Sequence, residues 1–196
     1  MIPRNIQITL VLLLIGVFAS GLYVLHLHKR TEEDLRQASA HGPVAPPRTG
    51  TTTDIDLTIA YDDDGVFRSR KFSSVLPSEP GARAKAILET LIAYYVDKPS
   101  PHPLADGAGI NNVFLLNQKL AVVDLNQALA EGHRSGIMAE DFTVMSLIDS
   151  LSANFPQLEQ VKILVDGKDR ETLAGHADLR STYNTAAVHK IVRELQ

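Results

Sequence analysis

The sequence predicts an α+β fold in which two main helices pack on one face of a mixed β-sheet, preceded by one transmembrane helix. Residues 6–27 form an almost unbroken apolar run. Residues 80–96 and 140–155 then carry apolar side chains at helical spacing, and alternating or continuous apolar runs around them are typical of strands. The predicted order is strand, strand, helix, strand, strand, helix, strand, which suits helices layered on a sheet.

Composition excludes several classes of function. The 196 residues are 44% hydrophobic and carry a net charge of −4, which indicates a globular protein. The first 50 residues have five basic and three acidic side chains, a charge of +2, so the remainder has a charge of −6. A domain of this charge lacks the basic surface that nucleic acid requires, and we expect no nucleic-acid partner. Because the chain has no cysteine, disulfides, thiolate nucleophiles and a lipid-modified cysteine are excluded.

The N-terminal apolar run predicts a transmembrane signal-anchor over residues 1–30. Its length fits the roughly 20 residues needed to cross a bilayer. A cleaved signal peptide is the alternative, because Ala19-Ser20-Gly21 resembles a cleavage site, but the run continues beyond it. Lys29 and Arg30 follow the run, so the charge count alone mildly favours a cytoplasmic C-terminal domain.

Three domain boundaries follow the anchor. Residues 31–53 are predicted to be a juxtamembrane segment and linker, since residues 41–53 contain three prolines and two glycines. Residues 54–180 are expected to form the folded domain. Residues 181–196 are expected to form a C-terminal helical extension, with apolar residues on one side of the helix.

The first part of the folded domain predicts a hairpin and a helix. Residues 55–61 alternate, and Asp62-Asp63-Asp64-Gly65 supplies a turn before residues 66–76 return as an edge strand. The three aspartates lack the ligand spacing of an EF-hand, so we interpret them as an acidic turn. After the helix at 80–96 comes a proline-rich loop, in which His102 and Asp106 are expected to be solvated.

The second part predicts the centre of the sheet. Residues 113–125 form two apolar strands joined at 117–119, and the connection 126–137 leads to the second helix. Residues 161–165 form the next strand, and Asp166-Gly167 turns the chain.

Known catalytic motifs are absent from the sequence. It contains no Gly-x-Ser-x-Gly elbow, no glycine-rich phosphate loop and no His-Glu-x-x-His. We therefore predict no catalytic residue, no cofactor and no metal site. The alternative is an envelope hydrolase or small-ligand-binding protein that uses His176, Asp178 and Asp124, with Asp166 nearby. Turn formation and capping also explain these residues.

The order of short motifs resembles the GerMN domain, named for sporulation and spore germination proteins. The resemblance covers about residues 55–180. It rests on Tyr61 with its Asp-Gly turn, Arg70, Ile87–Leu91, Ala121–Leu125, Ile148–Leu151, Val161–Gly167 and Leu173–Asp178. The resemblance implies a domain outside the cytoplasm, behind a membrane or lipoprotein anchor, with no established catalytic centre.

The expected function is thus a non-catalytic, membrane-tethered interaction module of the cell envelope. The resemblance favours an extracytoplasmic C-terminal domain on a single-pass protein of the inner membrane. It outweighs the charge count, which mildly favours the opposite orientation. The expected partners are a cell-envelope protein or a peptidoglycan-associated partner, together with the membrane through the N-terminal helix. Homo-oligomers are a further expectation, because a polar edge strand permits pairing between domains.

Overall fold

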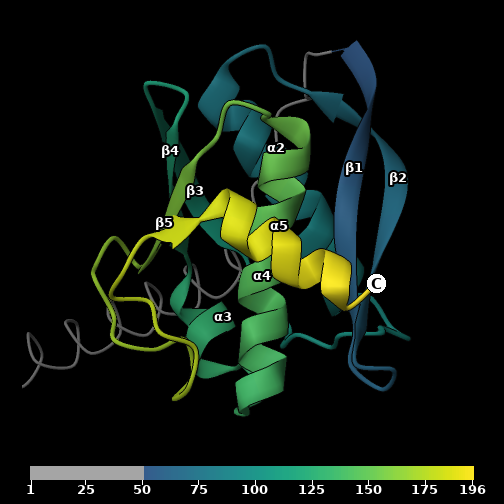
Figure 1. Cartoon of the computed structure of the whole chain (residues 1–196), viewed down its shortest axis with the longest axis vertical. Helices are drawn as coiled ribbons and strands as arrows, with labels where there is room; N and C mark the ends of the chain where they lie inside the picture. The colour runs from purple at the N-terminus through teal and green to yellow at the C-terminus, as the bar shows by residue number, and fades with distance from the viewer. Residues whose placement is uncertain (1–50) are drawn as a thin grey trace, which may run out of the picture. The chain divides into compact units, whose positions relative to one another are not determined.

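A computed structural model describes residues 51–196 of the chain (Figure 1). The predicted signal-anchor at 1–30 and residues 31–50 of the linker lie outside the described residues. The described residues belong to one compact unit. Within residues 51–196, no helix has both the length and the apolar character needed to cross a membrane.

The described elements follow the predicted order, with additions. They are β1 (Thr51–Tyr61), β2 (Val66–Leu76), α2 (Pro80–Val96), β3 (Ile110–Leu116), β4 (Leu120–Leu125), α3 (Gln127–Glu131), α4 (Ile137–Asn154), β5 (Gln160–Val165), β6 (Tyr183–Asn184) and α5 (Thr185–Glu194). The short α3 lies in the segment predicted to be a connection. β1 begins at Thr51, inside the predicted linker.

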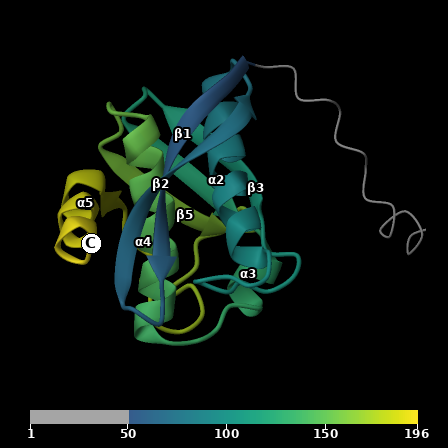
Figure 2. The same cartoon turned by 90° about the vertical axis from the view of Figure 1, so that its right-hand side faces the viewer.

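The α+β class is confirmed, but the single sheet is wrong. β1 and β2 form a separate antiparallel hairpin, and the other strands form a mixed sheet in the order β3-β4-β5-β6. β4 and β5 pair in parallel, and the other neighbours pair antiparallel. Figures 1 and 2 show α2 and α4 between the hairpin and the four-stranded sheet. The helices therefore cover two sheets, where one was predicted.

The two sheets stay separate because helix side chains occupy the outer edge of β1. The Asp56 amide donates to Asn154 Oδ1 at 3.2 Å, and Asn154 Nδ2 donates back to the Asp56 carbonyl at 2.7 Å. One turn earlier in α4, Ser150 Oγ accepts from the Thr58 amide at 2.9 Å. The side chains of α4 thus take the place of another strand, and the edge of β1 is covered.

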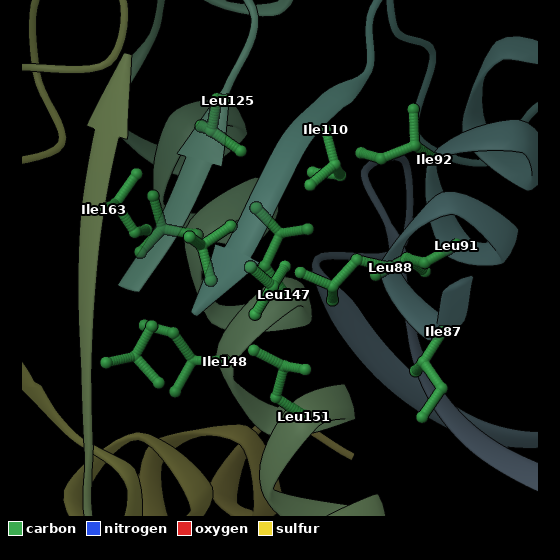
Figure 3. Packing of buried hydrophobic residues seen from close by; sticks show 14 of the residues in the cluster. Ile87, Leu88, Leu91, Ile92, Ile110, Leu125, Leu147, Ile148, Leu151 and Ile163 are labelled. Atoms are coloured by element: carbon green, nitrogen blue, oxygen red, sulfur yellow. The ribbon is translucent and has the colours of Figure 1, made fainter. Parts of the chain in front are cut away.

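The core fills the space between helices and sheets. Figure 3 shows Leu147, Ile148 and Leu151 of α4 beside Leu125 and Ile163 of the four-stranded sheet, all at most 1% exposed. Burying each such side chain contributes about 1.5–3 kcal/mol. The apolar spacing in the sequence predicted Ile148 and Leu151 on this face, and the structure adds Leu147.

The C-terminal helix belongs to the same fold. Val188 and Val192 on one side of α5 are buried. Beyond the helix, the Leu195 carbonyl accepts from the amide of Phe67 on β2 at 2.9 Å. The predicted helical extension therefore forms, and it packs against α4 and β2.

Candidate functional site

No helix among residues 51–196 covers the outer face of the four-stranded sheet, which carries apolar side chains together with Asp124 and Lys162 (Figure 1). Inward residues such as Val113 and Val123 are buried, and alternate residues point outward. Phe114 is 54% exposed and Leu116 is 47% exposed. Val122 and Leu120 of β4 lie opposite Phe114 and Leu116. Leu164 of β5 lies opposite Asp124 at the edge of this patch. Leu120, Val122 and Leu164 are partly exposed. We call these five residues the open sheet face.

Two predicted carboxylates form turns at the ends of neighbouring strands. Asp124 Oδ1 accepts from the Gly167 amide at 2.7 Å. Asp166 has a positive φ of 48°, and its Oδ1 accepts from Asn111 Nδ2 at 3.0 Å and from the Gln127 amide at 3.2 Å. The interpretation of Asp124 and Asp166 as turn residues is consistent with these contacts.

The structure does not bring His176, Asp178 and Asp124 together by hydrogen bonds. His176 Nδ1 lies 2.9 Å from Glu140 Oε1. Asp178 pairs instead with Arg180, with its Oδ1 3.0 Å from Arg180 Nε. That contact and the Arg180 amide hold the pKa of Asp178 below its usual range. Within the described part of the chain, none of these three side chains hydrogen-bonds to another of them.

Glu140 is the fully buried carboxylate of this region, and sequence reasoning assigned it only to the helix start. Its oxygens accept from the backbone amides of Ala174 at 2.9 Å, His176 at 2.8 Å and Ala177 at 3.0 Å. The amide of Gly136 donates to it at 3.2 Å. Burial raises the pKa of Glu140, but the hydrogen bonds from His176, Ala174 and Ala177 outweigh burial and bring the pKa to about 2. The carboxylate is therefore ionised and fixes the 174–177 loop.

A second buried polar group joins the hairpin turn to two loops and α4. His102 Nδ1 lies 2.6 Å from Asp62 Oδ1, and His102 Nε2 lies 2.6 Å from Thr143 Oγ1. His133 Nε2 lies 2.6 Å from the same Thr143 oxygen, and His133 Nδ1 lies 2.8 Å from the Arg134 carbonyl. We call this arrangement the His102 chain. The prediction that His102 is solvated is wrong, because the residue is 1% exposed.

Charge on the His102 chain follows from its surroundings. Burial raises the pKa of Asp62, but the hydrogen bond from His102 and the positive charges of His102 and Arg134 outweigh it, so that pKa is lowered. Burial lowers the pKa of His133, which favours its neutral form. Asp62 is also ion-paired with Arg134. The acidic turn predicted at Asp62 is therefore partly an internal ion-pair site.

Two donors of the His102 chain follow from their partners. The Arg134 carbonyl only accepts, so His133 donates from Nδ1. An ionised Asp62 also only accepts, so His102 donates from Nδ1. The Thr143 hydroxyl lies between the Nε2 atoms of the two histidines and 3.2 Å from the Ala139 carbonyl.

A third histidine–carboxylate pair joins α5 to α4. Buried Asp149 accepts from Thr58 Oγ1 at 2.5 Å, and its other oxygen lies 2.8 Å from His189 Nδ1. His189 also lines a hollow of about 380 Å³ between the ends of α4 and α5. No group of three or more metal-ligating side chains occurs within residues 51–196. The three pairs connect elements across the fold, and their contacts are those of structural crosslinks.

Residues 58–171 match a family model named Germane, described as sporulation and spore germination. That stretch is more than half of the chain. The chain belongs to this family. The Germane match contains the whole His102 chain and Glu140, whereas His176 and His189 lie beyond residue 171.

Solved structures resemble this Germane chain at low identity. The tandem GerMN domains of the sporulation protein GerM from Bacillus subtilis align over 67% of this chain and 45% of theirs, with 19% identity and a TM-score of 0.50. The first GerMN domain of the same protein aligns over 66% of this chain and 95% of its own, with 18% identity and a TM-score of 0.47. A candidate lipoprotein from Clostridium perfringens aligns over 72% and 92%, with 16% identity and a TM-score of 0.43. No curated protein matches. The tandem structure supports a GerMN fold here.

Proposed function

We propose that residues 51–196 are a non-catalytic protein-binding module of the cell envelope. Residues 6–27 hold it at the inner membrane, with the module outside the cytoplasm. Its partner is another envelope protein or a protein associated with peptidoglycan. Membership of the Germane family and the apolar N-terminal run support this placement.

The open sheet face is the observation that carries the binding role. Its two most exposed residues, Phe114 and Leu116, lie two apart on β3 and point the same way. Leu120 and Val122 lie opposite them on β4, which makes the apolar surface continuous. Contiguous exposed apolar surface of this kind marks interaction sites in soluble domains. Aromatic side chains are also favoured at the centres of interfaces.

The polar groups support a role without catalysis. Glu140 accepts backbone hydrogen bonds, Asp124 closes a turn, and Asp178 pairs with Arg180. Each carboxylate thus already has a partner that explains its position. Thr143, His102 and Asp62 do place a hydroxyl, an imidazole and a carboxylate in series, but Thr143 and His102 are buried. A nucleophilic site would need a hydroxyl that substrate can reach.

Replacing Phe114 and Leu116 together with serine is expected to abolish partner binding without unfolding the domain. Both side chains are about half exposed, so each loss is expected to cost roughly half of the 1.5–3 kcal/mol that full burial contributes. A photo-crosslinking residue at Val122 in the full-length chain, expressed in the source cells, should capture one partner in the wild type. The same capture should fall at least tenfold in the double variant.

The matched control is the pair Ile137 and Met138, which are 68% and 54% exposed at the start of α4. Their replacement with serine removes a similar apolar area away from the open sheet face. Capture from Val122 should persist in this control. Equal capture by both double variants would contradict binding through the open sheet face.

A reporter fused after Gln196 tests the orientation. Alkaline phosphatase, which folds outside the cytoplasm, is expected to be active in this fusion, and β-galactosidase is expected to be inactive. Fractionation should recover the fusion with the membrane. Activity of the cytoplasm-dependent reporter alone would reverse the proposed orientation.

A further inference from the structure

One long strand edge of the fold has no partner among residues 51–196. The outer edge of β1 is bonded by helix side chains, and the four-stranded sheet ends at β6, which is only two residues long. At β3, α2 lies so close that a Cβ on Gly81 would be 2.8 Å from the Val113 carbonyl. Lys85 Nζ also donates to the Asn111 carbonyl at 2.8 Å. The remaining edge is that of β2, on the outside of the hairpin (Figures 1 and 2).

The hydrogen bond of Phe67 shows which backbone groups of β2 point away from β1. The Phe67 amide points away from β1 and donates to the Leu195 carbonyl at 2.9 Å. In an antiparallel strand, alternate residues direct their amides and carbonyls to the same side. The outward groups are therefore those of Ser69, Lys71, Ser73 and Val75. No hydrogen bond to the backbone groups of these four is present in the described part of the chain. The first three are exposed. We call this segment the β2 edge.

Length and geometry suit the β2 edge to strand addition. Four outward residues at every second position span about 20 Å of extended chain, enough for a typical strand. The α5 end occupies the next outward position at Phe67 and so marks where an added strand must stop. Main-chain hydrogen bonds to such an edge supply affinity, and the flanking side chains supply specificity.

Charge at the β2 edge favours an acidic partner over a second copy. Arg68, Arg70 and Lys71 are exposed on this strand. Arg68 pairs with Asp64, and Arg70 donates to the Tyr94 hydroxyl, while Lys71 makes no ion pair within residues 51–196. If two copies paired antiparallel through this edge, their basic residues would lie opposite one another, which is destabilising. The acidic residues of β1 lie one strand further away, across the hairpin.

We propose that the β2 edge binds an extended acidic segment of an envelope protein by strand addition. The inference rests on the proposed binding function and adds a second surface to it, with a defined partner chemistry. The added strand lies antiparallel or parallel to β2 and accepts hydrogen bonds from the Ser69, Lys71 and Ser73 amides. Its carboxylates lie beside Arg70 and Lys71.

The test uses the full-length chain in nanodiscs of neutral lipid and a fluorescent peptide of eight alternating Glu and Val residues. Binding is followed by fluorescence anisotropy, and amide hydrogen exchange identifies the site. At saturation, exchange at Ser69, Lys71 and Ser73 is expected to slow at least tenfold. The same peptide with Lys in place of Glu is expected to bind at least tenfold more weakly.

The discriminating variants are Ser69→Pro/Ser73→Pro and Ser69→Ala/Ser73→Ala. Proline removes only amides that point outward, so the ladder between β1 and β2 is retained. Alanine removes the same hydroxyls, including the one that donates to Asp54, but keeps the amides. The proline variant is expected to lose at least tenfold in peptide affinity, and the alanine variant to stay within about twofold of wild type.

Three results would overturn the proposal. The first is equal peptide affinity of the proline and alanine variants. The second is protection of the β2 amides from hydrogen exchange that rises with protein concentration when no peptide is present. The third is the same protection in the free chain at every protein concentration. The second result would indicate pairing of two copies, and the third an occupant from the chain itself. The Phe114→Ser/Leu116→Ser variant should bind the peptide normally, so failure of the β2 edge leaves the open sheet face independently testable.

Discussion

Replacing Glu140 with alanine is expected to cost roughly 3 kcal/mol or more of the free energy of unfolding. The carboxylate is fully buried and accepts three backbone hydrogen bonds from the 174–177 loop. Alanine leaves those amides without a partner in a site closed to solvent, at about 1–3 kcal/mol for each buried group. Urea unfolding followed by circular dichroism measures the loss, since the chain has no tryptophan.

Asp141 provides the matched control for Glu140. It is the next residue of α4, and burial together with the charge of Glu140 raises its pKa. Its ionised form is therefore disfavoured in the fold. Asp141→Ala is expected to leave the free energy of unfolding within about 1 kcal/mol of wild type. Equal losses in the two variants would show that the hydrogen bonds of Glu140 are not the cause.

The pH dependence of the free energy of unfolding provides a second test of the Glu140 carboxylate. Its pKa is near 2 in the fold and about 4.5 in its ordinary environment. Because the folded pKa is the lower one, the stabilisation is complete above about pH 4.5 and is lost as the pH falls toward 2. The difference in unfolding free energy between wild type and Glu140→Gln should narrow across that window. A constant difference down to pH 2 would exclude an ionised Glu140 as the source.

Local patterns in the sequence predicted the elements well but not the division into two sheets. Alternation identified residues 55–61 as a strand, and 3.6-residue periodicity identified both main helices. Strand partners depend on contacts across the chain. The pairing of β1 with side chains such as Asn154, 98 residues away, has no local signal.

The buried histidines show why the candidate site was harder to predict. His102 lies among prolines, a context typical of solvent-exposed loops, and its partners are 40 and 41 residues away. Only the fold brings them together. Thr143 lies on an apolar face of α4. A threonine hydroxyl in a helix can bond to its own backbone, and Thr143 lies 3.2 Å from the Ala139 carbonyl, so its sequence position does not indicate a histidine partner. The Asp-Gly turn was predictable because its cause is local. The burial of Asp62 beside it was not.

Thr143→Val is expected to destabilise the domain by about 2–5 kcal/mol. Valine has nearly the shape of threonine, so the core stays filled, but the hydroxyl between His102 and His133 is lost. Both Nε2 atoms are then buried without a partner. Thr143→Ser is the matched control, because it keeps the hydroxyl and loses only a methyl group. Its cost is expected to be about 1 kcal/mol. Thermal and urea unfolding of the two variants give the comparison.

The two histidine rings show whether this result is more than a packing effect. The Thr143 oxygen lies 2.6 Å from Nε2 of His102 and 2.6 Å from Nε2 of His133, so both rings report on the hydroxyl. In ¹⁵N NMR spectra, the ring-nitrogen shifts of both histidines are expected to be nearly the same in wild type and in Thr143→Ser. In Thr143→Val the Nε2 shifts of both rings should change, because valine offers neither a donor nor an acceptor. Unchanged Nε2 shifts in the valine variant would show that its loss of stability does not come from these hydrogen bonds.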